Sequence, residues 1–302
     1  MNTKKQLSGK LRYTLTNDYL FHIVFQRNTK VLKGLLCSLL HLAENEIVDI
    51  YLENPIDPGE KVDDKAVILD LLITLNNNCR INIEMQLINR NDWPERSLVY
   101  LCRSFNNLTT GQDYIDVMPT IHIGILDFTL FPKYPEFYAR YAMKNIKNEN
   151  IYSDKLLLNV LDLTQIHLAT DEDIQSGLAH WAKLFKTETW EDLQMLASQY
   201  RDFEDIPDTM QKALEDKKIR LQCEARERYE RDRTSLYNCG KRDGIDIGKS
   251  EGANIERNEG IKKLIFILQK AGTSKEFAKE QLIEQYKLPE AVADEKLDLY
   301  WK

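Results

Sequence analysis

The sequence has few of the features that mark secreted, zinc-binding or membrane proteins. Its five cysteines form no CxxC pair, which argues against a disulfide framework or a zinc site and favours reduced thiols. No run of about eighteen apolar residues occurs, so neither a transmembrane helix nor a membrane partner is expected. The first residues lack the apolar core of a signal peptide, and the expected location is therefore the cytoplasm.

An excess of positive charge is also missing. The 302 residues have a formal net charge of −7, which argues against a protein that coats nucleic acid, although a local basic patch would still attract DNA. The hydrophobic fraction of 43% and the charged fraction of 29% are those of a globular chain. The length allows one large domain and a smaller one, which we place at residues 10–210 and 211–302.

The stretch RINIEMQLI alternates like a β-strand and contains an acid. Glu84 and Gln86 would share one face of this strand, and apolar residues would fill the other face. Because an unpaired, ionised carboxylate in apolar surroundings costs several kcal/mol or more, Glu84 needs a cation, a set of hydrogen bonds or a metal.

A β-hairpin is predicted from KAVILDLLITL and RINIEMQLI, which flank the turn residues NNNC. Asp70 and Glu84 are equidistant from Asn77, so a three-residue loop, Asn76 to Asn78, sets the two acids directly opposite each other on one face. A two-residue loop would put them on opposite faces. The asparagines favour the three-residue loop, because Asn tolerates a left-handed backbone.

Two facing carboxylates repel each other unless a cation compensates them. Oxygen ligands from two strands, with open positions for water and phosphate, suit Mg²⁺ or Mn²⁺. Such an ion polarises a phosphoryl oxygen and lowers the pKa of its bound water, which permits phosphodiester hydrolysis. Gln86 would orient the water or the phosphate. The alternative is that Asp70 and Glu84 are solvated, or paired with lysine or arginine.

A helix is predicted for DWPERSLVYLCRSF, directly after the Glu84 strand. Arg96 and Tyr100 lie one turn apart on one face of this helix. Arg96 would bind a phosphate there; the alternative is an exposed arginine beside a half-buried tyrosine. His122, in a later apolar segment, is expected to be structural.

The remaining segments complete an α/β pattern. TNDYLFHIVFQ and TKVLKGLLCSLLHL have the apolar stripes of two helices, the first capped by Thr16 or Asn17. EIVDIYLEN, PTIHIGILDFTLF, PEFYARYAMKN and DKLLLNVLDL are predicted strands, and the second of these is apolar enough to be central.

The C-terminal part is predicted to be mostly helical, with residues 172–233 helical throughout. In NCGKRDGIDIGKSEG glycine recurs every fourth residue, and each glycine costs about 1 kcal/mol in a helix relative to alanine. A loosely ordered linker is therefore favoured, and a helix whose glycine stripe admits another helix is the alternative. Residues 260–302 would form two helices at a tight turn, either helix-turn-helix-like or a small docking hairpin. The charged helix at 211–233 and the glycine stripe would support a homodimer.

Four segments taken in order resemble the Rpn family, recombination-promoting nucleases of the PD-(D/E)xK superfamily that are also described as transposases. They are TNDYLFHIVF, ILDLLITLNNNCRINIEMQ, RSLVYLCRSFNNLTTGQDY and PTIHIGILDFTLF. The resemblance runs from about residue 14 to about residue 260. It implies a restriction-endonuclease-like core, in which helices flank a mixed sheet and a metal is held at the hairpin.

The resemblance also implies roles for individual residues. Asp70 and Glu84 stand at the two acids of the motif. Asp18 matches an acid on the first helix, which completes the metal shell in some relatives of this fold; the alternative is an acid favoured by the helix dipole. Gln86 stands where the superfamily has lysine, as in many Rpn-like sequences, and it supplies a dipole where lysine supplies a charge.

The expected function is metal-dependent endonucleolytic cleavage of DNA, in an α/β fold with a helical C-terminal extension. The expected catalytic residues are Asp70, Glu84 and Gln86, and Arg96 and Tyr100 are expected to contact the substrate. The resemblance also implies a role in recombination or mobile DNA. The alternative is a catalytically inactive nuclease-fold module that binds DNA or protein, which the glutamine and the net charge favour and the two retained acids disfavour.

Overall fold

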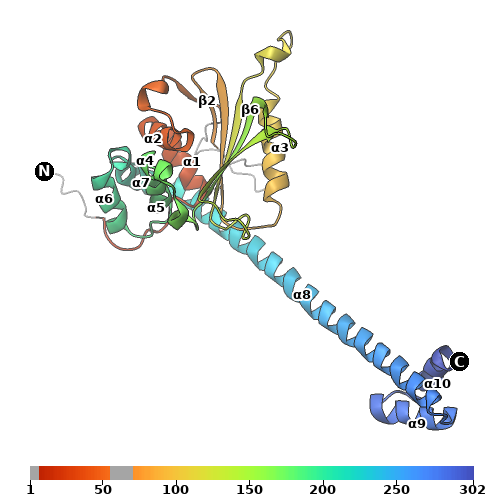
Figure 1. Cartoon of the computed structure of the whole chain (residues 1–302). Helices are drawn as coiled ribbons and strands as arrows, with labels where there is room; N and C mark the ends of the chain where they lie inside the picture. The colour runs from red at the N-terminus through yellow and green to blue at the C-terminus, as the bar shows by residue number, and fades with distance from the viewer. Residues whose placement is uncertain (1–6, 55–70) are drawn as a thin grey trace. The chain divides into compact units, whose positions relative to one another are not determined.

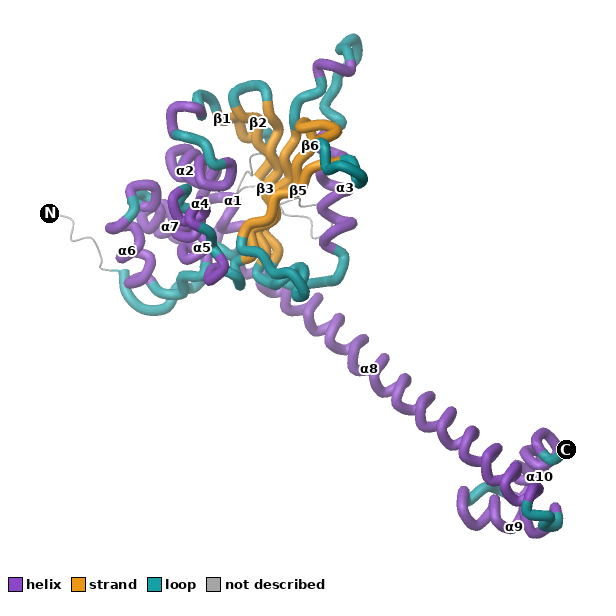
Figure 2. The backbone as a smooth tube through the Cα atoms, in the orientation of Figure 1, coloured by secondary structure: helices purple, strands orange, loops and turns teal. Residues whose placement is uncertain are grey.

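The computed structural model describes residues 7–54 and 71–302 of the chain. The chain divides into two compact units, residues 1–228 and 229–302. The first unit contains a six-stranded sheet with helices on both faces, and the second unit is helical (Figures 1 and 2). Among the described residues, no helix combines the length and the apolarity needed to cross a bilayer.

The sheet is mixed, with the strand order β1-β2-β3-β4-β6-β5. β3, β4 and β6 run parallel to one another, and the other neighbours pair antiparallel. The strands are β1 (Ile50–Leu52), β2 (Leu71–Leu75), β3 (Cys79–Gln86), β4 (Thr120–Leu126), β5 (Tyr138–Lys144) and β6 (Ile151–Asp162). All six predicted strands are present, and β4 is central, as its apolar sequence predicts.

The β2–β3 hairpin has the predicted register and loop. Leu71 pairs with Ile83 and Leu75 pairs with Cys79, so each pair is equidistant from Asn77. Asn76 and Asn77 adopt left-handed backbone angles, with φ of 50° and 55°, as the asparagine content predicts. Asp70 itself lies outside the described residues, so the pairing with Glu84 stays a prediction.

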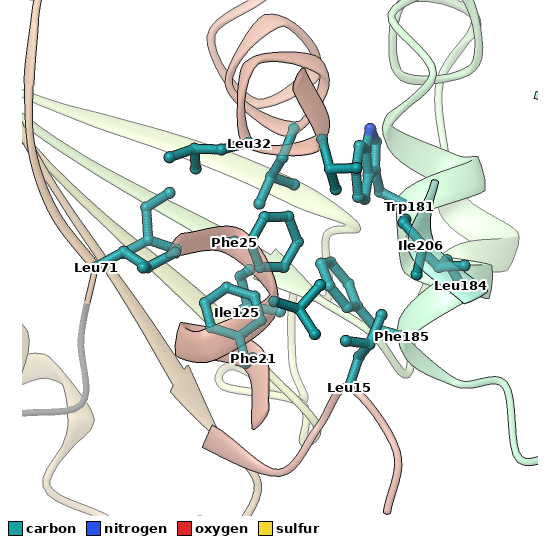
Figure 3. Packing of buried hydrophobic residues seen from close by; sticks show 14 of the residues in the cluster. Leu15, Phe21, Phe25, Leu32, Leu71, Ile125, Trp181, Leu184, Phe185 and Ile206 are labelled. Atoms are coloured by element: carbon teal, nitrogen blue, oxygen red, sulfur yellow. The ribbon is translucent and has the colours of Figure 1, made fainter. Parts of the chain in front are cut away.

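One face of the sheet packs on helices α1 (Asp18–Arg27), α2 (Thr29–Leu40) and α5 (Leu178–Phe185). Asn17 caps α1 by accepting a hydrogen bond from the Leu20 amide, which confirms one of the two predicted caps. The aromatic rings of Phe25 and Phe185 lie 6.5 Å apart, and those of Phe25 and Trp181 lie 6.0 Å apart (Figure 3). These contacts join the N-terminal helices to the helices that follow the sheet.

Residues 172–233 are mostly helical, but the prediction that they are helical throughout is wrong, because turns divide them into separate helices. They are α4 (Asp171–Gln175), α5, α6 (Trp190–Gln199), α7 (Ile206–Glu215) and the start of α8 (Lys217–Lys270). Gly177 separates α4 from α5 at a φ of 80°, a left-handed conformation that suits glycine. Pro207 lies in the first turn of α7, where its missing N–H leaves no hydrogen bond unmade.

The other face of the sheet is covered by α3 (Trp93–Phe105), as Figure 1 shows. Trp93 is buried against Gly124 of β4. A Cβ atom at Gly124 would lie 2.1 Å from Cζ2 of Trp93, so a side chain there would push α3 away. Glycine at this position therefore fixes how closely the first turn of α3 approaches β4.

The glycine-rich segment is part of helix α8, so the favoured prediction of a linker is wrong. Gly272, with a φ of 73°, follows the end of α8, and Ser274 caps α9 (Lys275–Tyr286). The C-terminal end of α8 packs with α9 and α10 (Glu290–Tyr300) around a small core. Its fully buried members include Ile265, Leu282 and Ala293.

Candidate active site

The Glu84 side chain is buried on the α3 face of the sheet. Alternation along β3 places Glu84 on the face opposite to Ile81 and Ile83, which belong to the main core. Only 1% of the Glu84 surface is exposed, and its neighbour in β4 is Gly124. A carboxylate in this position requires positive charge or hydrogen-bond donors nearby.

Arg96 supplies that positive charge from the first turns of α3. Its Nη2 forms an ion pair with Oε1 of Glu84. The guanidinium carbon also lies 5.3 Å from the ring centroid of Tyr100, one turn further along the helix. The structure thus brings together three residues that sequence spacing selected, and the tyrosine ring helps to hold the arginine in place.

His122 of β4 also borders the carboxylate. Its Nε2 lies 3.8 Å from Oε2 of Glu84, and its Nδ1 lies 3.0 Å from Nδ2 of Asn82. Burial, assisted by the charge of Arg96, lowers the pKa of His122 to about 4, so the ring is neutral at neutral pH. Because the Asn82 amide donates to Nδ1, the single ring proton is on Nε2, the nitrogen nearer to Glu84.

The sequence contains only a weak signal for His122 as a site residue. It is a lone histidine in an apolar segment, about forty positions away from Glu84 in the chain. The β3–β4 pairing places it beside Asn82, and this parallel pairing cannot be read from local alternation. The rings of Trp93 and Tyr100 lie 5.8 Å and 6.1 Å from the His122 ring, so α3 covers this part of the site.

Gln86 lies two residues beyond Glu84 on the same face of β3. It is 9% exposed, and its Nε2 donates a hydrogen bond to the carbonyl of Ile88 at 3.0 Å. This hydrogen bond orients the amide nitrogen of Gln86 toward the backbone at Ile88. The side-chain oxygen of Gln86 is consequently the end of the amide that can accept a hydrogen bond from a bound group.

Asp18 lies in the first turn of α1 and pairs with Arg226 of α8. Nε of Arg226 lies 2.9 Å from Oδ2 and 3.1 Å from Oδ1 of Asp18. The neighbouring Asn17 donates from Nδ2 to the carbonyl of Cys223 at 3.1 Å. The proposed metal-binding role of Asp18 stays a prediction, and its observed partner is an arginine.

The donor chemistry of Glu84 fits a hard divalent cation. Carboxylate oxygens are the ligands that Mg²⁺ and Mn²⁺ prefer, and the buried Glu84 already draws a positive partner from α3. In the stretches 7–54 and 71–302, no group of three or more His, Cys, Asp or Glu side chains gathers as a metal site. The second predicted acid, Asp70, lies outside these stretches.

Comparison with protein-family models matches residues 15–239 to a family described as PD-(D/E)XK nuclease family transposase. No curated protein and no solved structure matches the chain. The matched range includes the β2–β3 hairpin, α3 and all six strands. A mixed sheet flanked by helices is consistent with the restriction-endonuclease-like fold that the sequence resemblance implies. Because the match covers most of the chain and contains the Glu84 strand and the Arg96 helix, the protein belongs to the PD-(D/E)XK nuclease family transposases.

Proposed function

We propose that the protein is a divalent-metal-dependent DNA endonuclease. The observation that supports this most is the buried Glu84 carboxylate, which faces Arg96 inside the region matched to the nuclease family. A carboxylate this deeply buried, facing a basic side chain, is an unusual feature to build into a sheet for stability alone. A link to recombination or mobile DNA would follow from the family description.

Asp70 and Glu84 would hold Mg²⁺ or Mn²⁺, with Asp18 as a further ligand. When bound, the ion would polarise the scissile phosphate and lower the pKa of water. The side-chain oxygen of Gln86 would accept a hydrogen bond from the attacking water, since its nitrogen is engaged with Ile88. The Nε2–H of neutral His122 would help to orient the Glu84 carboxylate.

During the reaction, Arg96 would leave the Glu84 carboxylate and pair with a phosphate of the substrate. In the structure its guanidinium is paired with Glu84 and is 29% exposed on the side chain, so it can reach both the buried acid and solvent. A guanidinium matches the geometry of a phosphate with two parallel hydrogen bonds. Tyr100 would position Arg96 through the stacking contact observed between them.

The second candidate is a catalytically inactive nuclease-fold module that binds DNA or protein. Two observations favour it. Both Glu84 and Asp18 are paired with arginines, which can neutralise these acids without a metal, and glutamine occupies position 86. If this candidate is correct, Mn²⁺ will leave the melting temperature unchanged, because a ligand stabilises a protein only by binding its folded state.

Cleavage of supercoiled plasmid by the purified chain tests the two candidates. With Mg²⁺ or Mn²⁺ we expect nicking that EDTA abolishes. Glu84→Gln and Asp70→Asn should each lower the rate roughly 100-fold or more, which is the scale of losing one preorganised electrostatic contact at the transition state. Glu149→Gln, an exposed acid in the β5–β6 turn, is the matched control and should cleave normally.

Two results would count against the proposal. A folded protein that does not cleave with either metal, and whose melting temperature neither metal raises, would favour the inactive module. Cleavage that survives in both Glu84→Gln and Asp70→Asn would place the chemistry elsewhere. We also propose that the C-terminal region forms a homodimer, since many nucleases of this fold act on two strands as dimers.

A further inference from the structure

A hollow with a volume of about 330 Å³ lies on the opposite face of the sheet from Glu84. Asn159 of β6 lines it and pairs with Ile123, which in turn pairs with Ile83. Since side chains of paired residues share a face, the hollow is on the Ile83 side and the active site is on the other. The apolar wall of the hollow consists of Leu40, Leu42, Leu75, Ile121 and Leu157.

The polar wall contains a hydrogen-bond acceptor that is left unused. Asn159 is 2% exposed, and its Oδ1 has no hydrogen-bond partner within the described part of the chain. The orientation of this amide is determined by its neighbours. The Tyr138 hydroxyl donates its only proton to the carbonyl of Leu39, so it must accept from Nδ2 of Asn159, at 2.9 Å.

This chain of hydrogen bonds excludes the flipped amide. If Oδ1 and Nδ2 of Asn159 were exchanged, Oδ1 would face a hydroxyl oxygen that has no second proton to give. Burial also raises the pKa of Tyr138, so the hydroxyl stays protonated. The acceptor in the hollow is therefore a carbonyl oxygen, and a buried acceptor of this kind requires a donor from a bound molecule or water.

Two opposite charges border the same hollow without pairing with each other. Arg140 is the partner of Asn159 across β5 and β6, so the two side chains are neighbours on one face. No ion pair of Arg140 is found among residues 7–54 and 71–302. Glu46 accepts a hydrogen bond from the amide of Ala43 at 2.7 Å, and no cation within the described residues pairs with it.

We propose that this hollow binds a free apolar α-amino acid. The α-carboxylate would pair with the guanidinium of Arg140, which recognises a carboxylate with two hydrogen bonds. The α-ammonium group would donate to Oδ1 of Asn159 and to the carboxylate of Glu46. The side chain would contact the leucine and isoleucine wall, and the volume of the hollow lies within the range of small-molecule pockets.

This chemistry explains why Arg140, Asn159 and Glu46 occur together in the lining, which also includes Asn76 and Asn78. The ligand has a carboxylate and an ammonium group on adjacent carbon atoms, and the lining of the hollow includes a guanidinium beside the Asn159 amide and a carboxylate from Glu46. Water can satisfy Asn159, but it cannot use the apolar wall. The site is separate from the active site, so the proposal does not depend on nuclease activity.

Isothermal titration calorimetry of the full chain with L-leucine is the test. We expect a dissociation constant of about 1 mM or tighter, a modest affinity suited to a ligand with few atoms. L-leucinamide lacks the carboxylate, N-acetyl-L-leucine lacks the ammonium group, and glycine lacks the apolar side chain. Each of these three probes should bind at least about tenfold more weakly.

A matched pair of variants identifies the site. Arg140→Gln removes the proposed carboxylate partner from an exposed position and should weaken L-leucine binding at least about tenfold. Lys144→Gln removes an exposed cation from the same strand and should bind as the parent does. Absence of L-leucine binding at about 10 mM overturns the proposal, and so does equal binding of L-leucinamide or of Arg140→Gln.

Discussion

At the scale of single residues, the site depends on how one buried acid is compensated. Glu84 is almost fully buried and has a guanidinium on one side and a neutral imidazole on the other. The imidazole is kept neutral because burial and Arg96 both disfavour a second positive charge. Glu84 is thus bordered by a strong cation and by a weak donor that carries no charge, and protonation of that donor should disturb the site.

The stability of the first unit is predicted to fall between about pH 6.5 and pH 4. The unfolded state protonates His122 near its ordinary pKa of about 6.5, whereas the folded state resists protonation until about pH 4. In this window the unfolded state binds more protons, so the free energy of unfolding decreases as the pH decreases, by on the order of 3 kcal/mol in total. Urea unfolding in EDTA, followed by tryptophan fluorescence, measures this loss.

His122→Gln separates this effect from the titration of carboxylates elsewhere. The variant keeps polar atoms near Asn82 but has no titrating group in this pH window. Its free energy of unfolding should therefore depend less on pH than that of the parent between pH 6.5 and 4. Parallel curves for the two proteins would show that His122 titrates normally and that its burial has no such consequence.

At the scale of secondary-structure elements, α8 is the least expected feature. Gly240, Gly244, Gly248 and Gly252 all lie inside it, and an added Cβ atom at any of them would meet nothing within 4 Å. Each glycine lowers helix stability by about 1 kcal/mol relative to alanine. Within the described part of the chain, no contact at these four positions compensates that loss.

Replacing the four glycines with alanine is therefore predicted to stabilise this part of α8. A gain of about 0.5–1 kcal/mol at each position should slow amide hydrogen exchange between residues 236 and 256 by at least tenfold. Ser250→Ala, at another exposed position in the same stretch, is the control and should change exchange much less. Faster exchange in the alanine variant would mean that the glycines are needed for close packing with another helix.

The comparison of sequence with structure shows which signals were sufficient. The hairpin register followed from alternation and from the three asparagines, because both are local and specific. The helix in the glycine-rich segment could not be predicted from the sequence. Low helix propensity is only weak evidence against a helix, because helix formation is cooperative and the helical turns on either side extend through the glycines. The breaks between α4 and α7 were also missed, because amphipathic segments separated by short turns resemble one long helix.

The candidate site was recognisable in part for the same reason. Arg96 and Tyr100 were selected by spacing along one helix, and α3 follows the Glu84 strand directly. His122 was not selected, because its approach to Glu84 depends on a parallel pairing of β3 and β4 across α3. A contact made through a crossover connection leaves no trace in local periodicity.

At the scale of the whole molecule, the start of α8 belongs to the first unit. Ile219 and Cys223 are fully buried in the main core, and Arg226 pairs with Asp18 of α1. A chain ending at residue 210 would lose all of these contacts. Removing large buried apolar side chains costs about 2–5 kcal/mol each, so such a truncation should unfold more easily. The better point to cut is after residue 228, where the first unit ends.

The proposed homodimer makes a specific prediction for this cut. Residues 229–302 contain the exposed part of α8 and the small C-terminal core, so a dimer formed there requires this region. Light scattering should give the full chain twice its own mass, whereas residues 1–228 should be monomeric and retain their cooperative unfolding. If the full chain is monomeric at about 100 μM, far above a micromolar dissociation constant, the C-terminal region does not dimerise the protein. If residues 1–228 are dimeric, the interface belongs to the first unit, and the glycine positions of α8 remain open for a different partner.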